Sequence, residues 1–327
     1  MINTPKKNFK RVISIFTMLV ILLICFFSGC SNDDDIEIIL VPSGFSVTFI
    51  DVGNGDCIFI NFGDGKNMLI DCGLDTQANY DNITNVLDAH NVHSIDYLVL
   101  THPDVDHIGN ASKIILKYPV KKAFIPNVYN KEPYETFKKV YELLVSLKVE
   151  INYSNYFTNI SGDNYFLAFL SPCSSMIGSY YGEFNGIVNP TEKDINDLSP
   201  IIYLDYNGVR FLFTGDAGIK QEKLLIEKYK VGLYDQIHDV DVNLYDIDLL
   251  KVAHHGSEDG SGLEFLTMLR PKYAVFSVGG NNIYGHPSAR VINNLYHVNS
   301  TVKILRTDVL GSICITVTKD GMLKVLE

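Results

Sequence analysis

The sequence predicts an α/β protein arranged as a four-layer αββα sandwich. Two observations support this fold class: a run of strands is followed by alternating helices and strands, and the pattern begins again near Ser199. No linker interrupts the middle of the chain, so we expect a single domain over residues 43–327. Hydrophobic residues make up 46% of the 327 residues and charged residues 20%, which excludes collagen-like, coiled-coil and wholly disordered proteins.

The first half of this domain contains short segments of alternating apolar residues, typical of strands, and apolar spacings of three and four, typical of helices. The turn Gly63-Asp64-Gly65 separates the second and third segments and predicts a hairpin there. We expect strands at residues 45–50, 57–61, 68–70, 95–100, 123–125 and 165–170, and helices at 82–90, 108–118 and 134–147.

The second half contains the strongest hairpin signal, because Asn207-Gly208 joins two apolar segments. Residues 174–196 are rich in Ser, Gly, Asn and Tyr and predict a long surface loop, which either shapes a substrate site or is an insertion without a role there. We expect strands at residues 201–206, 209–214, 247–252, 273–278, 302–305 and 313–317, and helices at 220–230, 262–269 and 289–296.

Residues 1–29 are interpreted as a targeting segment that lies outside the fold. A basic stretch precedes the apolar residues 12–27, and two small residues then precede Cys30. This segment resembles a bacterial lipoprotein signal, which implies cleavage before Cys30, a lipid on its sulfur and a position on the extracellular face of the cell membrane. A retained signal anchor is the alternative, although sixteen residues are few for a membrane span. Residues 30–42 then form an acidic tether.

Two cysteines of the mature chain, Cys57 and Cys72, lie at similar distances on either side of the first hairpin turn. Their spacing allows a disulfide in an exported protein, or two small buried apolar residues, and we favour the second interpretation. No mature cysteine belongs to a CxxC pair, which disfavours a zinc knuckle.

The decisive motif is THPDVDHIG at residues 101–109, which follows a predicted buried strand and opens a helix. It places His102, Asp104, Asp106 and His107 within six residues. Imidazole and carboxylate groups are the ligands that borderline and hard divalent cations take. In a tight loop the first pair can face one position and the second pair another. Helix capping by the aspartates is the alternative, but it explains neither histidine.

Two further strand ends supply matching groups. Residues 211–216 form a predicted strand that ends in Asp216, and residues 249–257 form one that ends in His254 and His255. Ligand sites of open sheets gather where strands end, so we expect these groups to meet the first motif.

These motifs, HxDxDHxG, GD and HHGS, resemble the metallo-β-lactamase fold superfamily. More narrowly, they resemble the hydrolase domain at the C-terminus of ComEC-type competence proteins, over about residues 45–318. The resemblance implies the αββα fold and a hydrolytic centre, for which we expect two divalent metal ions, zinc or manganese. Supporting stretches are DVGNGD at residues 51–56, LIDCG at 69–73, YGHP at 284–287 and RTD at 306–308.

The resemblance also implies roles for single residues. His102 and Asp104 are expected to bind the first metal. Asp106, His107 and His255 are expected to bind the second, with His254 as the alternative to His255. Asp216 is expected to bridge the two metals, and Asp71 to be a structural carboxylate. In this sequence Asp104 stands where many members have histidine. Many members also carry a histidine shortly before the bridging aspartate, and the nearest candidate for that position in this sequence is Asn196. Asp104 makes the first site harder and less selective for zinc. Asn196 is a weaker ligand than histidine, which bears on the occupancy of that site and brings in manganese beside zinc.

We expect a metal-bound hydroxide to attack phosphorus, oriented by Asp106 or Asp104. If His254 is not a ligand, it protonates the leaving oxygen or orients His255. His286 either contacts the substrate or a metal ligand, or is a satisfied turn histidine.

Arg306 either clamps a phosphate or forms a salt bridge with Asp308. Both alternatives suit its place in the RTD stretch, and the sequence alone leaves them open.

The resulting hypothesis is an exported, lipid-anchored, metal-dependent phosphodiesterase or nuclease. Removal of residues 1–29 takes away four basic and no acidic residues, so the formal net charge falls from −11 to −15. Since proteins that hold long nucleic acid through their whole surface are usually basic, DNA would be held locally, near the metals. The alternatives are a phosphodiesterase acting on cell-surface polymers such as teichoic acid decorations, and a non-catalytic metal-binding surface module. We infer no obligate protein partner.

Overall fold

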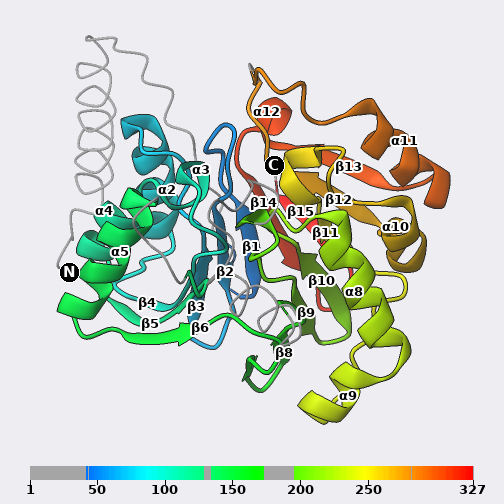
Figure 1. The fold of residues 1–327 in the computed structure, drawn as a ribbon, viewed down its shortest axis with the longest axis horizontal. Coiled ribbons are helices and arrows are strands. Elements are labelled where there is room, and N and C mark those ends of the chain that lie inside the picture. The colour runs from blue at the N-terminus through cyan, green and yellow to red at the C-terminus, as the bar shows by residue number, and fades with distance from the viewer. Residues whose placement is uncertain (1–41, 43, 129–133, 173–194, 281, 327) are drawn as a thin grey trace, which may run out of the picture. The chain divides into compact units, whose positions relative to one another are not determined.

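The computed structural model describes residues 42, 44–128, 134–172, 195–280 and 282–326, which lie within a compact unit formed by residues 40–327. Within these ranges the strands form two sheets, one of eight strands and one of seven. Helices cover the outer face of each sheet, so the layers are those of the predicted αββα sandwich (Figure 1). The predicted fold class is therefore confirmed.

The first sheet has the order β15-β14-β1-β2-β3-β4-β5-β6. The pairs from β3 to β6 are parallel, and the remaining pairs are antiparallel. Figure 1 shows its helices α2, α4 and α5 on one side of it. Its elements are β1 (Ser46–Phe49), β2 (Ile58–Asn61), β3 (Asn67–Ile70), α2 (Gln77–Ala89), β4 (Ile95–Val99), α3 (Val105–Ile108), α4 (Ala111–Lys117), β5 (Val120–Ile125), α5 (Glu135–Ser146), β6 (Glu150–Tyr153), β14 (Ile313–Val317) and β15 (Leu323–Leu326).

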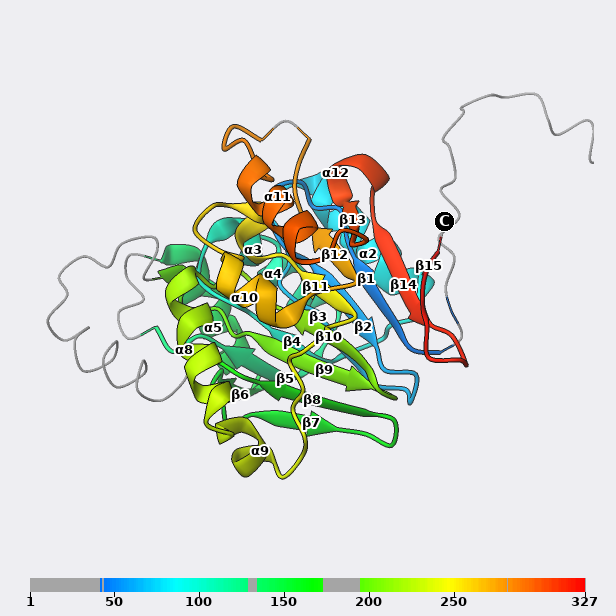
Figure 2. The same ribbon diagram turned by 90° about the vertical axis from the view of Figure 1, so that its right-hand side faces the viewer.

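The second sheet has the order β13-β12-β11-β10-β9-β8-β7, and Figure 2 shows its helices α8, α10 and α11 in front of it. The predicted hairpin turn is present, since Asn207 and Gly208 both have positive φ, at 52° and 83°. Its elements are β7 (Asn159–Ser161), β8 (Tyr165–Phe169), β9 (Ile202–Tyr206), β10 (Val209–Phe213), α8 (Ile219–Lys230), α9 (Leu233–His238), β11 (Leu249–Lys251), α10 (Leu263–Leu269), β12 (Tyr273–Phe276), α11 (Ala289–Val298), β13 (Lys303–Arg306) and α12 (Thr307–Leu310).

A core of aliphatic and aromatic side chains fills the space between the two sheets. Phe49 of β1 packs against Phe213 of β10, with ring centroids 6.2 Å apart, and Phe124 of β5 packs against Phe169 of β8 at 5.3 Å. A second core lies between the second sheet and its helices and includes Phe265. Burial of such large side chains fixes the strands of both sheets, and with them the loops at the strand ends.

Several elements differ from the expectations. The helix predicted at residues 108–118 is two helices, α3 and α4, which meet at Gly109 and Asn110. The strands β6, β7 and β15 and the helix α9 were not predicted. The edge strand β6 (Glu-Ile-Asn-Tyr) alternates polar and apolar residues, but it has only four residues and all of them are exposed or half-buried, so no buried face marks it.

Some sequence expectations lie outside the described residues, namely the targeting segment, Cys30, nearly all of the tether, and residues 173–194 of the predicted loop and its flank. In the part of the chain that the structure describes, no helix combines the length and apolar character needed to cross a membrane. Cys57 and Cys72 are both free and buried, as the favoured interpretation predicts.

Candidate metal centre

The loop after β4 supplies the first group of polar side chains. His102 and His107 are fully buried, whereas the side chains of Asp104 and Asp106 are 30% and 35% exposed. The short helix α3 turns this loop back toward the sheet, and Gly55 approaches it so closely that a Cβ there would overlap the backbone oxygen of Asp106.

The Asp216 carboxylate is the point on which four histidines converge. Its Oδ2 atom lies 3.4 Å from Nε2 of His107, 3.6 Å from that of His255, 3.7 Å from that of His254 and 4.0 Å from that of His102. Asp216 follows β10, and His254 and His255 follow the parallel neighbour β11. The loop after β4 approaches from the other sheet, so both sheets contribute to one cluster.

The two remaining aspartates divide the cluster into two sides. Asp104 Oδ2 lies 3.7 Å from Nε2 of His102, and Asp106 Oδ2 lies 3.7 Å from Nε2 of His255. The expected first-metal residues therefore lie together, and so do the expected second-metal residues. Asp216 lies between them.

The unpaired atoms of the cluster fit a divalent cation. Nε2 of His102, His107 and His255 and Oδ1 of Asp216 are buried and have no hydrogen-bond partner among the described residues. Each such group costs about 1–3 kcal/mol if nothing binds it. Two ligands that are each about 2.1 Å from one cation lie about 3–4 Å apart, which matches the separations around Asp216. The donor set of imidazole and carboxylate suits zinc and manganese.

Three buried histidines are held through the nitrogen that faces away from Asp216. Nδ1 of His107 donates to Asp71 Oδ2 at 2.8 Å, and Nδ1 of His255 donates to the Ser277 carbonyl at 2.9 Å. Nδ1 of His102 lies 3.0 Å from Oγ1 of Thr101. With a proton on Nδ1, each imidazole directs the lone pair of Nε2 toward Asp216.

Asp71 anchors this arrangement from beneath the metal loop. Besides His107, it accepts hydrogen bonds from the backbone N–H of Thr101 at 2.8 Å and from its hydroxyl at 2.7 Å. The Thr101 hydroxyl thereby connects Asp71 to His102. One fully buried carboxylate thus orients both histidines of the loop.

Burial and nearby charge set the protonation of the cluster. Burial holds the pKa of His102 well below its usual range, so this imidazole is neutral at pH 7. Burial alone would raise the pKa of the Asp216 carboxyl, but His107 and His255 hold it well below its usual range. Although burial lowers it, the nearby carboxylates, Asp216 first, raise the pKa of His107 and of His255, so a cation that binds these two imidazoles displaces a proton.

The turn that carries His254 and His255 has an unusual backbone. Both residues have left-handed conformations, with φ of 48° and 51°, and Gly256 follows with φ of 85°. Such a conformation costs a non-glycine residue about 1–2 kcal/mol. This turn places both side chains within 4 Å of the same carboxylate oxygen.

A buried ion pair beneath the cluster was not predicted from the sequence. Nζ of Lys251 lies 2.5 Å from Asp56 Oδ2 and donates to the Gly215 carbonyl at 3.2 Å. Asp56 Oδ1 lies 3.6 Å from Nδ1 of His255. The sequence signal that could have indicated this ion pair is the lysine within the apolar strand LLKV, because a buried cation needs a partner.

The other predicted residues have varied positions. Asn196 is buried, with Oδ1 unpaired among the residues described. The ring of His286 lies 5.9 Å from that of His254. Arg306 donates to both carboxylate oxygens of Asp308, at 2.9 and 2.5 Å, so the salt-bridge alternative describes it. Ser199 was missed: its hydroxyl accepts from the backbone N–H of Asp216 at 3.2 Å.

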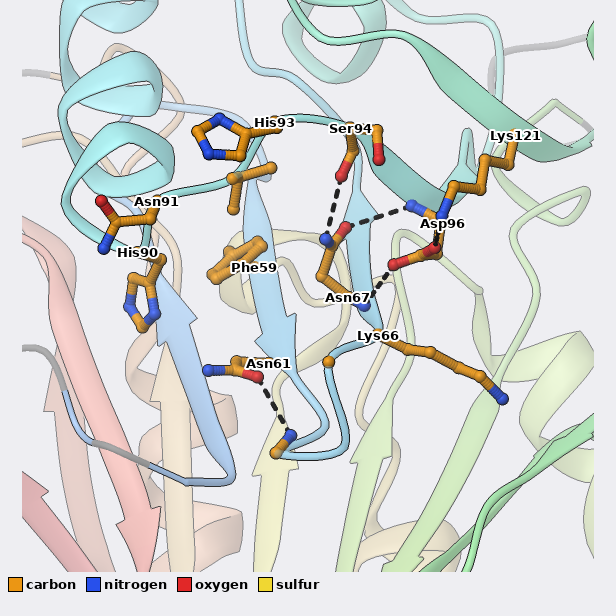
Figure 3. Close-up of a pocket in the computed structure, with 13 residues that line it drawn as sticks. Phe59, Asn61, Lys66, Asn67, His90, Asn91, His93, Ser94, Asp96 and Lys121 are labelled. Carbon is orange, nitrogen blue, oxygen red and sulfur yellow. Dashed lines mark hydrogen bonds and ion pairs between the residues drawn. The ribbon is translucent and has the colours of Figure 1, made fainter.

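A separate pocket lies at the opposite ends of strands β2 to β4 (Figure 3). It has a volume of about 440 Å³ and is lined by polar side chains such as Asn61, Asn67 and His93. None of the residues around Asp216 lines this pocket. The metal cluster is therefore not part of it.

The fold and the cluster of imidazoles and carboxylates support a metal-dependent hydrolase. A family profile described as the metallo-beta-lactamase superfamily matches residues 50–193, so the chain carries a metallo-β-lactamase domain, and the two sheets have its fold.

The chain is similar to ComE operon protein 3 of Bacillus subtilis, with 28% identity over 282 residues, which cover 82% of this chain and 32% of that protein. It is also similar to competence protein ComA of Neisseria gonorrhoeae, with 27% identity, 85% of this chain and 33% of that protein. The predicted resemblance to competence proteins is confirmed. The chain spans about a third of the length of these relatives.

Among solved structures, the chain is similar to the metallo-β-lactamase fold protein YhfI from Bacillus subtilis. The identity is 11%, the comparison covers 86% of this chain and 100% of that chain, and the TM-score is 0.47.

Proposed function

We propose that this protein is a metal-dependent phosphodiesterase of the nuclease type, exported and anchored to the outer face of the cell membrane by a lipid on Cys30. The observation that carries the catalytic part is the convergence of four imidazoles on the Asp216 carboxylate. The N-terminal sequence and the similarity to competence proteins support the location and the nucleic-acid substrate.

The grouping of the side chains supports two cation positions. We assign His102 and Asp104 to the first, and Asp106, His107 and His255 to the second, with Asp216 shared between them. Bound zinc or manganese lowers the pKa of water and neutralises charge on the phosphoryl oxygens.

The residues of the chain then have distinct tasks. Asp106 and Asp104, the most exposed carboxylates of the cluster, lie where they can orient the attacking water. The side chain of His254 is 19% exposed, whereas those of the other three histidines are nearly or fully buried, so it can reach the substrate. We assign it the transfer of a proton to the leaving oxygen.

The first experiment measures hydrolysis of bis(p-nitrophenyl) phosphate and single-stranded DNA by the purified full chain, with zinc and manganese in turn. We expect metal-dependent cleavage of both substrates and its loss in Asp216→Ala. Asp241→Ala is the matched control, because this aspartate is exposed and lies outside the cluster.

The remaining outcomes contradict parts of the proposal. Cleavage of the small ester alone would contradict the nuclease and point to base-free phosphodiesters of the cell surface. Bound metal without cleavage of either substrate would contradict the phosphodiesterase and favour a binding module.

A further inference from the structure

The loop between β12 and α11 carries an exposed aromatic side chain close to the metal cluster. Tyr284 is 69% exposed, and its ring lies nearly parallel to that of His286, with 13° between the planes and 5.8 Å between the centroids. The ring of His286 lies 5.9 Å from that of His254, which reaches Asp216. A continuous series of rings therefore leads from the cluster to the surface.

This part of the loop is held firmly in place. The Asn282 side chain donates to the carbonyls of Gly279 and His286, both at 2.8 Å, and accepts from the backbone N–H of His286 at 2.8 Å. The backbone N–H of Ser288 donates to the Gly256 carbonyl at 2.9 Å, and this bond connects the loop to the turn that carries His254 and His255. These bonds fix the backbone on both sides of Tyr284, so less backbone entropy is lost when a ligand binds to its ring.

The residues near Tyr284 offer little unpaired positive charge for binding a polyanion. Two arginines of this region are already paired, Arg290 with Glu258 and Arg306 with Asp308. The net charge of the whole chain is −11, so general attraction for a polyanion is weak. A nucleic acid that binds here needs a source of affinity other than phosphate contacts, and a base stacked on an aromatic ring provides one.

We propose that Tyr284 is a base-stacking subsite and that the substrate is a single-stranded nucleic acid rather than a phosphodiester polymer without bases. The inference rests on the proposed phosphodiesterase function. A base on Tyr284 positions its strand so that a neighbouring phosphodiester reaches the cluster past His286 and His254. The strand must be single, because a paired base is already stacked within a duplex.

The test is equilibrium binding by the metal-loaded full chain, measured by fluorescence anisotropy. The probes are a labelled phosphorothioate oligodeoxythymidylate, which resists cleavage, and an abasic oligomer of the same length. We expect Tyr284→Ala to weaken binding of the thymidylate about 5- to 100-fold and to leave the abasic oligomer unchanged.

Three further variants separate stacking from other effects. Tyr284→Phe keeps the ring and should bind as the wild type does. Tyr284→Leu keeps an apolar side chain without a ring and should resemble Tyr284→Ala. Tyr296→Ala is the matched control, because Tyr296 is also exposed but lies on α11 and has no ring contact with His286.

Equal binding of both oligomers by the wild type would overturn the inference, as would unchanged thymidylate binding by Tyr284→Ala. These outcomes are independent of turnover. A chain that binds bases through Tyr284 but cleaves no phosphodiester would contradict the proposed function alone. A chain that cleaves phosphodiesters and ignores bases would contradict this inference alone.

Discussion

Lys251 and Asp56 form a fully buried ion pair directly beneath the metal cluster, with 2.5 Å between Nζ and Oδ2. The two residues come from different sheets, Lys251 from β11 and Asp56 from the loop before β2. The ammonium group also binds the Gly215 carbonyl, one residue before Asp216. The Lys251 ammonium thus joins strand β11 to two loops of the site.

Replacing only one partner should destabilise the protein strongly. In Lys251→Met the Asp56 carboxylate stays buried without its counter-charge, and we expect a loss of about 3–5 kcal/mol in the free energy of unfolding. The double variant Lys251→Met with Asp56→Asn removes both charges and should recover most of this loss. Urea denaturation of the metal-free full chain measures both effects. A double variant as unstable as the single one would contradict the prediction.

Replacing Asp71 should weaken metal binding. In Asp71→Asn the imidazole of His107 loses its charged acceptor, so its orientation is less well fixed. We expect metal affinity to fall about 10- to 100-fold, measured by competition with a chelating dye. Asp75→Asn is the matched control, since Asp75 is an exposed residue paired with Lys113. Equal affinities in the two variants would count against the orienting role of Asp71.

Glu222 should make stability depend on pH. Burial raises the pKa of this carboxyl to about 7, although the backbone N–H groups of Ser261 and Gly262 donate to it at 2.5 and 2.8 Å. The folded pKa is above the unfolded value near 4.5, so the carboxyl favours folding below pH 4.5, and this contribution is lost as the pH rises to 7.

The comparison with Glu222→Gln isolates this effect, because other titrating groups are common to both proteins. Relative to the variant, the wild type should lose up to about 3 kcal/mol between pH 4.5 and pH 7.5, at about 1.4 kcal/mol per pKa unit. Urea denaturation across this range measures the difference. A difference that rises with pH would have the wrong sign.

Gly256 should tolerate no side chain. A Cβ at this position would lie 2.7 Å from atoms of both Phe276 and Pro287, and the residue has φ of 85°. Gly208 has nearly the same φ, 83°, with nothing within 4 Å of such a Cβ. Gly256→Ala should therefore cost about 1–3 kcal/mol more than Gly208→Ala, because only the first variant adds overlap to backbone strain. Equal unfolding midpoints in urea would refute this.

The sequence alone was sufficient for the fold class and for the residues that meet at Asp216. Strands with clear apolar patterning were predicted well, and the polar motifs at their ends showed where ligand groups gather. Strand β6 was missed because it is only four residues long and has no buried residue, although its sequence alternates. The pairing of Lys251 with Asp56 was missed because the partners are far apart in the chain, and no local pattern identifies such a contact.

The choice between alternatives at single residues also needed coordinates. Arg306 and Asp308 lie two residues apart, and only the backbone of β13 and α12 brings them into bidentate contact. The carbonyl of Ser277 that holds His255 could not be identified either, because a backbone acceptor has no sequence signature.

The origin of the cluster in both sheets has a consequence for the durability of the protein. His102 and His107 come from one sheet, and Asp216 and His255 come from the other. The two cations that share Asp216 would connect segments about 110 to 150 residues apart and act as a reversible cross-link between the two halves. Cys57, Cys72 and Cys314 are free, so chelation would remove this cross-link without any disulfide among these three to replace it. Resistance to proteolysis should therefore follow metal supply.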